Sequence, residues 1–181
     1  MDALGMVECN SVAAGIEAGD GMLKVSAVCL AVAQPVCPGK FILMVRGDVA
    51  AVKSSVETGV LIGGENLIDS LVIPNVHPQV FQAVAAAAEI PELGAIGVLE
   101  TFSLASSIYA ADAMVKAADV RLVEIRLGRG LGGKSFTILT GDVSAVSEAV
   151  QVGKSAPQCQ GMLARSAVIP APHKAIWEAL L

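Results

Sequence analysis

The sequence predicts an α/β sandwich that occurs twice in tandem within one chain of 181 residues. Two observations lead to this fold class. The chain aligns with itself over most of its length, which is typical of internally duplicated proteins. Each copy also alternates short apolar segments, typical of buried strands, with segments that have the start and stop signals of helices. Strands that are apolar on both faces need helices to cover them, so we expect layered domains rather than a helical bundle.

The duplication is carried by three pairs of segments, separated by short insertions in the second copy. Two copies of this size fit two small domains. We place these domains at residues 1–90 and 91–181, with the boundary inside an alanine-rich segment. The aligned pairs are residues 3–24 with 95–116, residues 39–52 with 133–146, and residues 72–81 with 168–177.

Both copies predict the same order of elements. A strand leads to a helix that begins at a serine, and a lysine near its end suits the helix dipole. Two strands flanking a loop follow, then a second helix with an aspartate cap, a last strand, the motif "IPxxH" and a short helix. The predicted elements are strands 3–8 and 95–100, helices from Ser11 to Lys24 and from Ser103 to Lys116, strands 28–33 and 120–127, strands 41–45 and 136–140, and helices capped by Asp48 and Asp142.

The composition excludes several classes of function. The net charge is −5, and no cluster of Lys and Arg is interleaved with aromatic residues, which argues against nucleic-acid binding. The uncharged run 25–39 is interrupted by Pro35 and Pro38 and is no membrane span, and the N-terminus lacks a secretory pattern. Hydrophobic residues nevertheless make up 54% of the chain. We therefore expect a homo-oligomer whose interfaces cover the excess apolar surface.

The cysteines Cys9, Cys29, Cys37 and Cys159 are scattered along the chain. Without a C-x-x-C motif or an export signal they predict no disulfide framework, and they indicate a reducing cytosol. Their spacing matches no standard zinc or iron–sulfur pattern within one chain. Taken from the residues alone, Cys37 is an ordinary free cysteine in a loop between two prolines.

The segment from Gly128 to Ser135, "GRGLGGKS", matches the letter patterns of two nucleotide-binding loops. Both patterns need a helix directly after the loop, so that its N-terminus faces the phosphates. The residues after Lys134 are instead β-branched and apolar, and they predict a strand. A P-loop-like nucleotide-binding protein is therefore a disfavoured alternative. Because no catalytic triad, carboxylate pair or Cys/His arrangement stands out, we interpret the chain as non-enzymatic.

Several motifs recur in both copies in the same order: "GMVE" and "GVLE", "DGMLK" and "DAMVK", "GK" before a strand that ends in "GD", and "IPxxH". With these motifs the chain resembles, over essentially its whole length, the tandem-domain shell proteins of bacterial microcompartments. The resemblance implies two shell domains, each an α+β sandwich of the ferredoxin-like type, in a homotrimer that imitates a hexamer. It also implies tiling with other shell proteins, in the shell of a microcompartment within the bacterial cytoplasm.

The resemblance further implies a central pore lined by the loop after the second strand of each copy. The segment "VCPGKF" is most similar to the tandem shell protein of propanediol-utilisation microcompartments, in which matching cysteines of three subunits hold a 4Fe-4S cluster. It therefore implies such a cluster at Cys37, electron transfer across the shell and encapsulated redox enzymes as partners. A trimer with an open metabolite pore and no cluster is the alternative. The expected pore residues are Pro35, Val36, Cys37, Pro38 and Gly39 in the first copy and Arg129, Gly130, Leu131 and Gly132 in the second.

Lys24 and Lys116 have two interpretations. They either complete helix ends in solvent or, as the resemblance implies, lie at the edge of the tile beside a neighbouring subunit. Many shell domains carry an arginine after the first proline of the "IPxxH" motif, whereas this chain has Asn75 and Ala171 there. The chain departs from the family at these two edge positions.

The remaining recurring residues predict structural roles. His77 and His173 each stand alone at the start of a short helix, without an acidic partner nearby in the sequence. The acidic residues that recur because the chain is duplicated are expected to be solvated or to cap a helix; they are Glu8, Glu100, Asp20 and Asp112.

Overall fold

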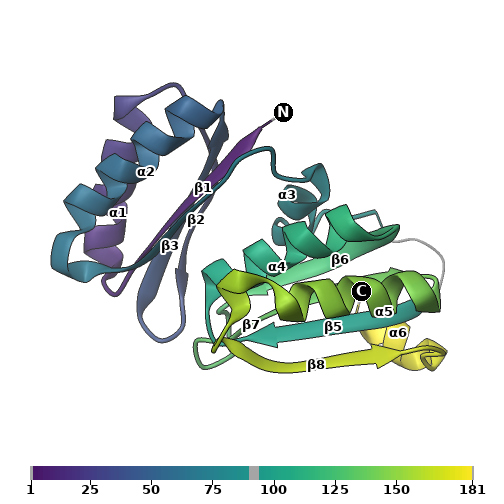
Figure 1. Ribbon diagram of the computed structural model, residues 1–181. Helices are drawn as coiled ribbons and strands as arrows, with labels where there is room; N and C mark the ends of the chain where they lie inside the picture. Colours follow the sequence, from purple (N-terminus) through teal and green to yellow (C-terminus); the bar gives the residue numbers. More distant parts are fainter. Residues whose placement is uncertain (1, 90–93, 181) are drawn as a thin grey trace. The chain divides into compact units, whose positions relative to one another are not determined.

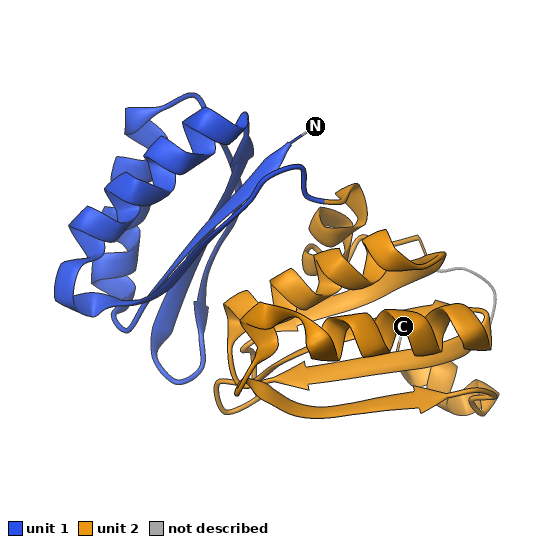
Figure 2. Cartoon of the chain, viewed as in Figure 1, with its two compact units in different colours: residues 1–76 blue, residues 77–181 orange. Residues whose placement is uncertain are grey.

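Each repeat folds into a four-stranded antiparallel sheet with two long helices on one face (Figure 1). The computed structural model describes residues 2–89 and 94–180. The contacts within the chain divide it into unit 1, residues 1–76, and unit 2, residues 77–181 (Figure 2). None of the helices in the described ranges combines the length and the hydropathy that crossing a bilayer would need.

Unit 1 has the predicted order of elements, and its strands pair in the order β2-β3-β1-β4. This βαββαβ arrangement is the ferredoxin-like fold, so the predicted fold class is confirmed. The helices α1 and α2 pack against each other. The elements are β1 (Ala3–Cys9), α1 (Val12–Val25), β2 (Cys29–Val36), β3 (Lys40–Gly47), α2 (Val49–Gly63), the 3₁₀ turn η1 (Gly64–Asn66) and β4 (Leu67–Ile73).

Unit 2 repeats this topology with the strand order β6-β7-β5-β8. The short helix α3 (Pro78–Val84) precedes its sheet in the chain, and α6 (Lys174–Ala179) follows it. Between them lie β5 (Ala95–Thr101), α4 (Leu104–Ala117), β6 (Val120–Leu127), β7 (Ser135–Gly141), α5 (Val143–Ser155), the 3₁₀ turn η2 (Pro157–Cys159) and β8 (Leu163–Ile169).

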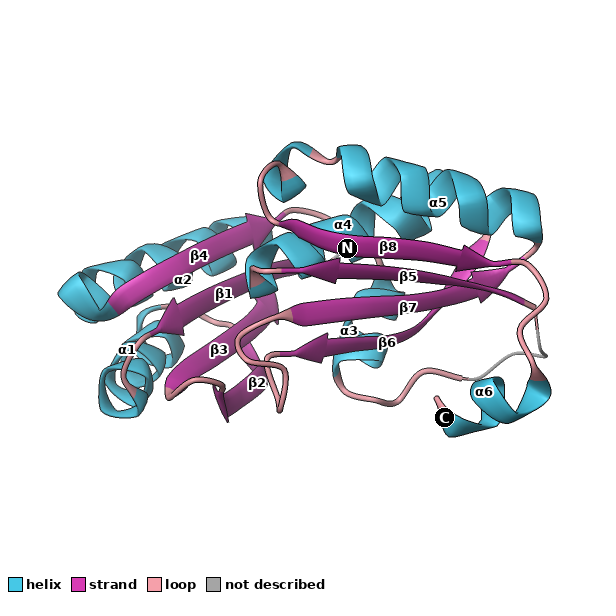
Figure 3. Cartoon of the chain, turned by 90° about the horizontal axis from the view of Figure 1, so that it is seen from below, coloured by secondary structure: helices cyan, strands magenta, loops and turns pink. Residues whose placement is uncertain are grey.

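The helix α3 belongs to the first repeat by sequence but to unit 2 by its contacts. It packs against β6 and α4, and Figure 3 shows it beside β6. Gln79 Oε1 accepts a hydrogen bond of 2.8 Å from the backbone N–H of Leu122, and Asp112 Oδ1 accepts one of 2.8 Å from that of His77. The contacts therefore divide the chain between residues 76 and 77. The domain boundary predicted between residues 90 and 91 lies outside the described residues.

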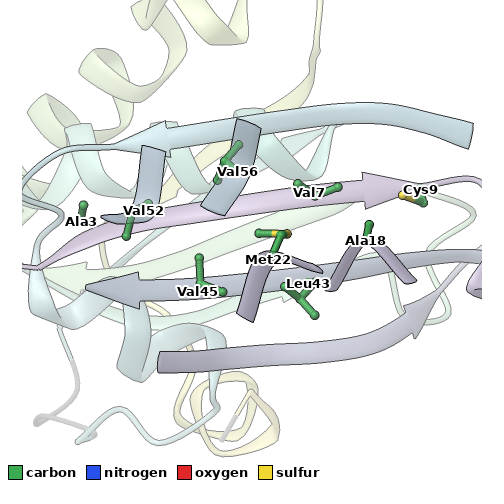
Figure 4. Close-up of a cluster of buried hydrophobic side chains, with 9 residues drawn as sticks. All are labelled: Ala3, Val7, Cys9, Ala18, Met22, Leu43, Val45, Val52 and Val56. Carbon is green, nitrogen blue, oxygen red and sulfur yellow. The ribbon is translucent and has the colours of Figure 1, made fainter. Parts of the chain in front are cut away.

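The core of unit 1 lies between its sheet and its two helices. Figure 4 shows Val7 of β1, Met22 of α1, Leu43 of β3 and Val56 of α2 together in this cluster. Small residues on the helices allow the close packing. A Cβ atom added at Gly15 of α1, for example, would lie only 2.7 Å from Cβ of Phe41.

Serine and histidine side chains begin four of the helices. Ser11 accepts a hydrogen bond of 3.4 Å from the N–H of Ala14, and Ser103 makes the same bond at the start of α4, as predicted. Nδ1 of His77 and Nδ1 of His173 accept bonds from the second residue of α3 and α6. The predicted structural role of the two histidines is therefore confirmed.

Asp48 and Asp142 are the N-cap residues of α2 and α5, but their side chains make no capping hydrogen bond. The predicted start of each helix is confirmed and the predicted capping bond is wrong. Both residues are exposed, so water solvates their carboxylates. Their negative charge still interacts favourably with the positive, N-terminal end of the helix dipole.

Replacing Gly15 by alanine is expected to destabilise unit 1. The new methyl group would lie too close to Cβ of Phe41, which the backbone of β3 holds in place, and such overpacking costs about 1–3 kcal/mol. Gly63→Ala is the matched control in α2, because its nearest contact would be an ordinary 3.5 Å to Sγ of Cys9. Urea unfolding should show a lower free energy of unfolding for Gly15→Ala alone, and equal values for the two variants would contradict the packing.

Two of the four cysteines are core residues. Cys9 is 0% exposed and Cys159 is 1% exposed, whereas Cys29 is exposed. Burial raises the pKa of the Cys9 thiol, and the nearby Glu8 charge raises it further. Burial likewise raises the pKa of the Cys159 thiol. Both groups therefore stay neutral thiols at a pH where an ordinary thiol has begun to ionise.

Iodoacetamide at neutral pH is expected to modify Cys29 in the native protein long before Cys9 or Cys159. The thiolate is the reactive form. At the two core positions the raised pKa lowers the fraction of thiolate, and burial restricts access of the reagent. Peptide mass mapping after timed quenching measures the three rates. Addition of denaturant should equalise the rates, and rapid native labelling of Cys9 or Cys159 would contradict their placement.

Candidate functional site

The hairpin between β2 and β3 carries Cys37. Pro35 and Val36 belong to β2 rather than to the predicted loop, because their pairing with β3 continues up to the turn. A proline fits there because β2 is an edge strand, where a missing N–H costs no ladder bond. The turn itself consists of Cys37, Pro38 and Gly39. Gly39 has φ +70°, in the left-handed region that glycine adopts without steric cost.

Cys37 is half-buried at the tip of this hairpin and forms no disulfide, while Pro38 and Gly39 are exposed. The prolines at positions 35 and 38 fix φ on both sides of the thiol and restrict its movement. Within residues 2–89 and 94–180, no group of three or more His, Cys, Asp or Glu residues lies together as a metal site. A soft metal centre at Cys37 therefore needs thiolates from other copies of the chain.

An ion pair joins the base of the hairpin to the neighbouring strand. Nζ of Lys40, the first residue of β3, lies 2.8 Å from Oε1 of Glu8 in β1. The Glu8 side chain is 3% exposed and that of Lys40 is 23% exposed. Glu8 is thus buried and paired, and the prediction that it is solvated or capping is wrong. The recurrence of both a glutamate and a lysine in the two repeats was the available signal for this pair.

Unit 2 has the corresponding ion pair beneath a different loop. Nζ of Lys134 lies 2.6 Å from Oε1 of Glu100, but the two side chains are 38% and 28% exposed. The loop from Gly128 to Lys134 is glycine-rich, and it connects two antiparallel strands. The predicted strand after Lys134 is confirmed, and the helix that a nucleotide-binding loop requires is replaced by β7. Four of the loop glycines, at 128, 130, 132 and 133, have positive φ.

The expected pore residues of the second loop lie at its surface. Arg129, Gly130 and Gly132 are exposed, and Leu131 is half-buried. None of these residues carries a side chain that ligates soft metals, in contrast to the hairpin of unit 1. The two loops therefore offer different chemistry at corresponding places in the two units.

The two lysines of the expected tile edge differ in their surroundings. Lys24 is paired with Asp20 at 2.5 Å, and both side chains are mostly exposed. Lys116 is paired with Asp112 at 2.6 Å, but the Asp112 side chain is only 10% exposed. Asp112 uses its other oxygen to accept the hydrogen bond from His77. The pair is thus exposed in the first repeat, as predicted for Asp20, and partly buried in the second. The prediction that Asp112 is solvated is wrong, because this carboxylate is buried and paired.

A family model described as the BMC domain matches residues 3–76 and again residues 95–172. The chain is 43% identical to the bacterial microcompartment shell protein PduT of Citrobacter freundii, over 99% of this chain and 97% of that protein. It is 33% identical to the carboxysome assembly protein CcmO of Synechocystis, over 93% of this chain and 61% of that protein.

A solved structure supports the same assignment. The crystal structure of a microcompartment protein from Desulfitobacterium hafniense superposes with a TM-score of 0.94 at 49% identity, covering 98% of this chain and 99% of that one. A fused permuted hexameric shell protein shares the fold at a TM-score of 0.60 and 22% identity. The chain therefore belongs to the BMC-domain family of bacterial microcompartment shell proteins and carries two such domains in tandem.

Proposed function

We propose that the chain is a non-enzymatic tile of a microcompartment shell in the bacterial cytoplasm, a homotrimer with a 4Fe-4S cluster on its axis. The proposed trimer places six BMC domains in a ring and tiles beside other shell proteins. Each subunit contributes Cys37 to the cluster. The observation that carries the proposal is the position of Cys37, a half-buried thiol at the tip of a stiff hairpin that occurs once per chain.

Unequal burial of the first helix in each unit supports the ring. On the outer side of α4, Leu104 and Ile108 are 0% exposed. The corresponding residues of α1, Val12 and Ile16, are 39% and 56% exposed. Apolar side chains of this size rarely form a continuous exposed stripe without a partner surface.

The opposite sheet faces show the converse inequality. On the helix-free face of unit 1, Met6 and Ile42 are 0% exposed. Their counterparts in unit 2, Val98 and Phe136, are only half-buried and line an open apolar pocket of about 340 Å³. The pocket is completed by Glu100, Ile138, Arg165, Ser166, Ala167 and Leu180.

The open helix side belongs to unit 1 and the open sheet face to unit 2. A second copy of the chain therefore fits in a head-to-tail manner, with its α1 on the open sheet face of the first. Such heterologous contacts close into a ring when the rotation between copies permits it. Three tandem chains supply the six domains of such a ring, and every copy then has its apolar surfaces covered.

Convergence of one thiol per subunit gives the proposed site its ligand chemistry. Three thiolates close to one axis repel one another, so they favour either protonation or a soft cationic centre that neutralises them. Pro35 and Pro38 hold the three thiols in one geometry. When bound, a 4Fe-4S cluster would supply one-electron transfer across the shell, with encapsulated redox enzymes as its partners.

A second candidate function is an open pore for metabolites, without a cluster. The exposed glycine-rich loop with Arg129 favours it, because these residues offer backbone groups and a positive charge to a polar solute. Lys24 and Lys116 are proposed to lie at the outer edge of the tile in either case. The Lys24 side chain is 73% exposed and that of Lys116 is 41% exposed, so Lys24 is the more accessible to a neighbouring tile.

Protein purified without oxygen, or reconstituted with iron and sulfide, is expected to be brown and to give an iron–sulfur EPR signal. Iron analysis should approach one cluster per trimer. Cys37→Ser should abolish the colour and the signal while light scattering still shows a trimer, and Cys29→Ser is the matched control that keeps both. Colourless wild-type trimer after reconstitution would exclude the cluster and leave the open pore.

Lys40→Met is expected to destabilise the hairpin that carries Cys37. It leaves the buried Glu8 carboxylate without its partner, and breaking a buried ion pair costs about 3 kcal/mol or more. Lys134→Met is the matched control in unit 2. Because Glu100 has access to water, that change should cost about 1 kcal/mol or less.

Denaturant unfolding of the two lysine variants measures the difference in stability. A loss of stability that is as large for Lys134→Met as for Lys40→Met would show that burial of Glu8 does not set the cost.

A further inference from the structure

The packing of α3 against β6 and α4 of its own unit serves as a template for a contact between two copies of the chain. On α3, Val80 and Ala83 are 0% exposed, and the helix packs against β6. At its start, the N–H of His77 donates to Oδ1 of Asp112, whose Oδ2 holds Lys116. Apolar packing and one charge-assisted hydrogen bond thus fix a helix from the end of one repeat.

The helix α6 is the counterpart of α3 at the end of the second repeat. Its one buried residue, Trp177, packs on the sheet of its own unit with Ile96, Val123 and Ile138. The side that corresponds to the buried side of α3 is open: Ile176, the counterpart of Val80, is 53% exposed. Ala179, the counterpart of Ala83, is exposed too. The helix α6 therefore has the same apolar side as α3, but this side is exposed to solvent.

The receiving surface occurs in unit 1, also without its helix. Leu30 of β2 is 51% exposed, whereas its counterpart Leu122 in β6 is 2% exposed. Both strands have a register shift at this position, so their local geometry matches. The Asp20 side chain is 61% exposed and binds Lys24 through Oδ2, the oxygen that Asp112 uses for Lys116.

We propose that α6 of one copy docks on α1 and β2 of a second copy, with Ile176 against Leu30 and the N–H of His173 donating to Asp20. The occupant is a second copy because both halves of the template are present in one chain but belong to different units. The contact rests on the proposed trimer and names the residues that close it. Trp177 keeps its place on its own sheet, since it lies on the other side of α6.

A disulfide trap tests the contact directly. Leu30→Cys and Ile176→Cys are combined in a chain in which Cys29 and Cys37 are serine, and the protein is oxidised mildly. Covalent dimers and trimers should appear on non-reducing gels when the chain carries both new cysteines. Neither control with only one new cysteine should give them. A native trimer that yields no covalent dimer overturns the docking of α6 while the trimer stands. A native protein that is monomeric by light scattering overturns both proposals.

Substitution of Asp20 tests the polar part of the contact. Asp20→Asn should weaken subunit association by about tenfold or more, because it removes the charge from the hydrogen bond to His173. Lys24→Met removes the ion pair but keeps the carboxylate, and it should change association by about twofold or less. Analytical ultracentrifugation over a dilution series measures both. Equal association of Asp20→Asn and the unmodified chain would overturn the role of Asp20.

Discussion

Apolar burial is unequal between two repeats that share one fold, and the proposed assembly depends on this inequality. Each repeat presents an outer side of its first helix and a sheet face that its two long helices leave uncovered. Leu104 and Ile108 of α4 and Met6 and Ile42 on the sheet face of unit 1 are 0% exposed, whereas Val12 and Ile16 of α1 are exposed and the sheet face of unit 2 carries an open pocket. Because the hydrophobic effect is proportional to the area removed from water, burial of the open pair would provide the driving force for the proposed trimer. In that proposal each repeat folds by itself, and a second copy covers the apolar surface that remains exposed.

The β2–β3 hairpin of unit 1 and the β6–β7 hairpin of unit 2 have different loops, while the strand pairing below the loops is the same. In both units a glutamate of the first strand pairs with the lysine that begins the third, at 2.8 Å and 2.6 Å. Above this shared base, unit 1 has a short proline-bounded turn with Cys37, and unit 2 has a longer glycine-rich loop. A threefold ring then carries three thiols rather than six. In the proposed trimer, the divergence of one loop therefore sets the number of thiol ligands at the axis.

Local signals in the sequence predicted the elements well. Apart from the absent capping bonds of Asp48 and Asp142, the failures arose where distant residues decide the outcome. The serine caps, the strand after Lys134 and the repeated order of elements depend on neighbours in the chain, and all are confirmed. The end of β2 at Val36 depends on pairing with β3, and the burial of Glu8 depends on Lys40, which lies far along the sequence. The grouping of α3 with unit 2 also needs tertiary contacts. The metal site at Cys37 was predicted from the resemblance to tandem shell proteins, and it stays a prediction because its proposed ligands come from other copies.

The template contact and its proposed copy between subunits differ in their hydrogen bonds, and this difference sets their relative strength. Gln79 of α3 accepts the N–H of Leu122 at the register shift of β6, whereas the corresponding residue of α6 is Ala175, which has no acceptor. The proposed contact between copies therefore rests on the packing of Ile176 against Leu30 and on the hydrogen bond from His173 to Asp20. We expect it to be weaker than the contact within the chain, because it lacks the partly buried hydrogen bond that Gln79 makes.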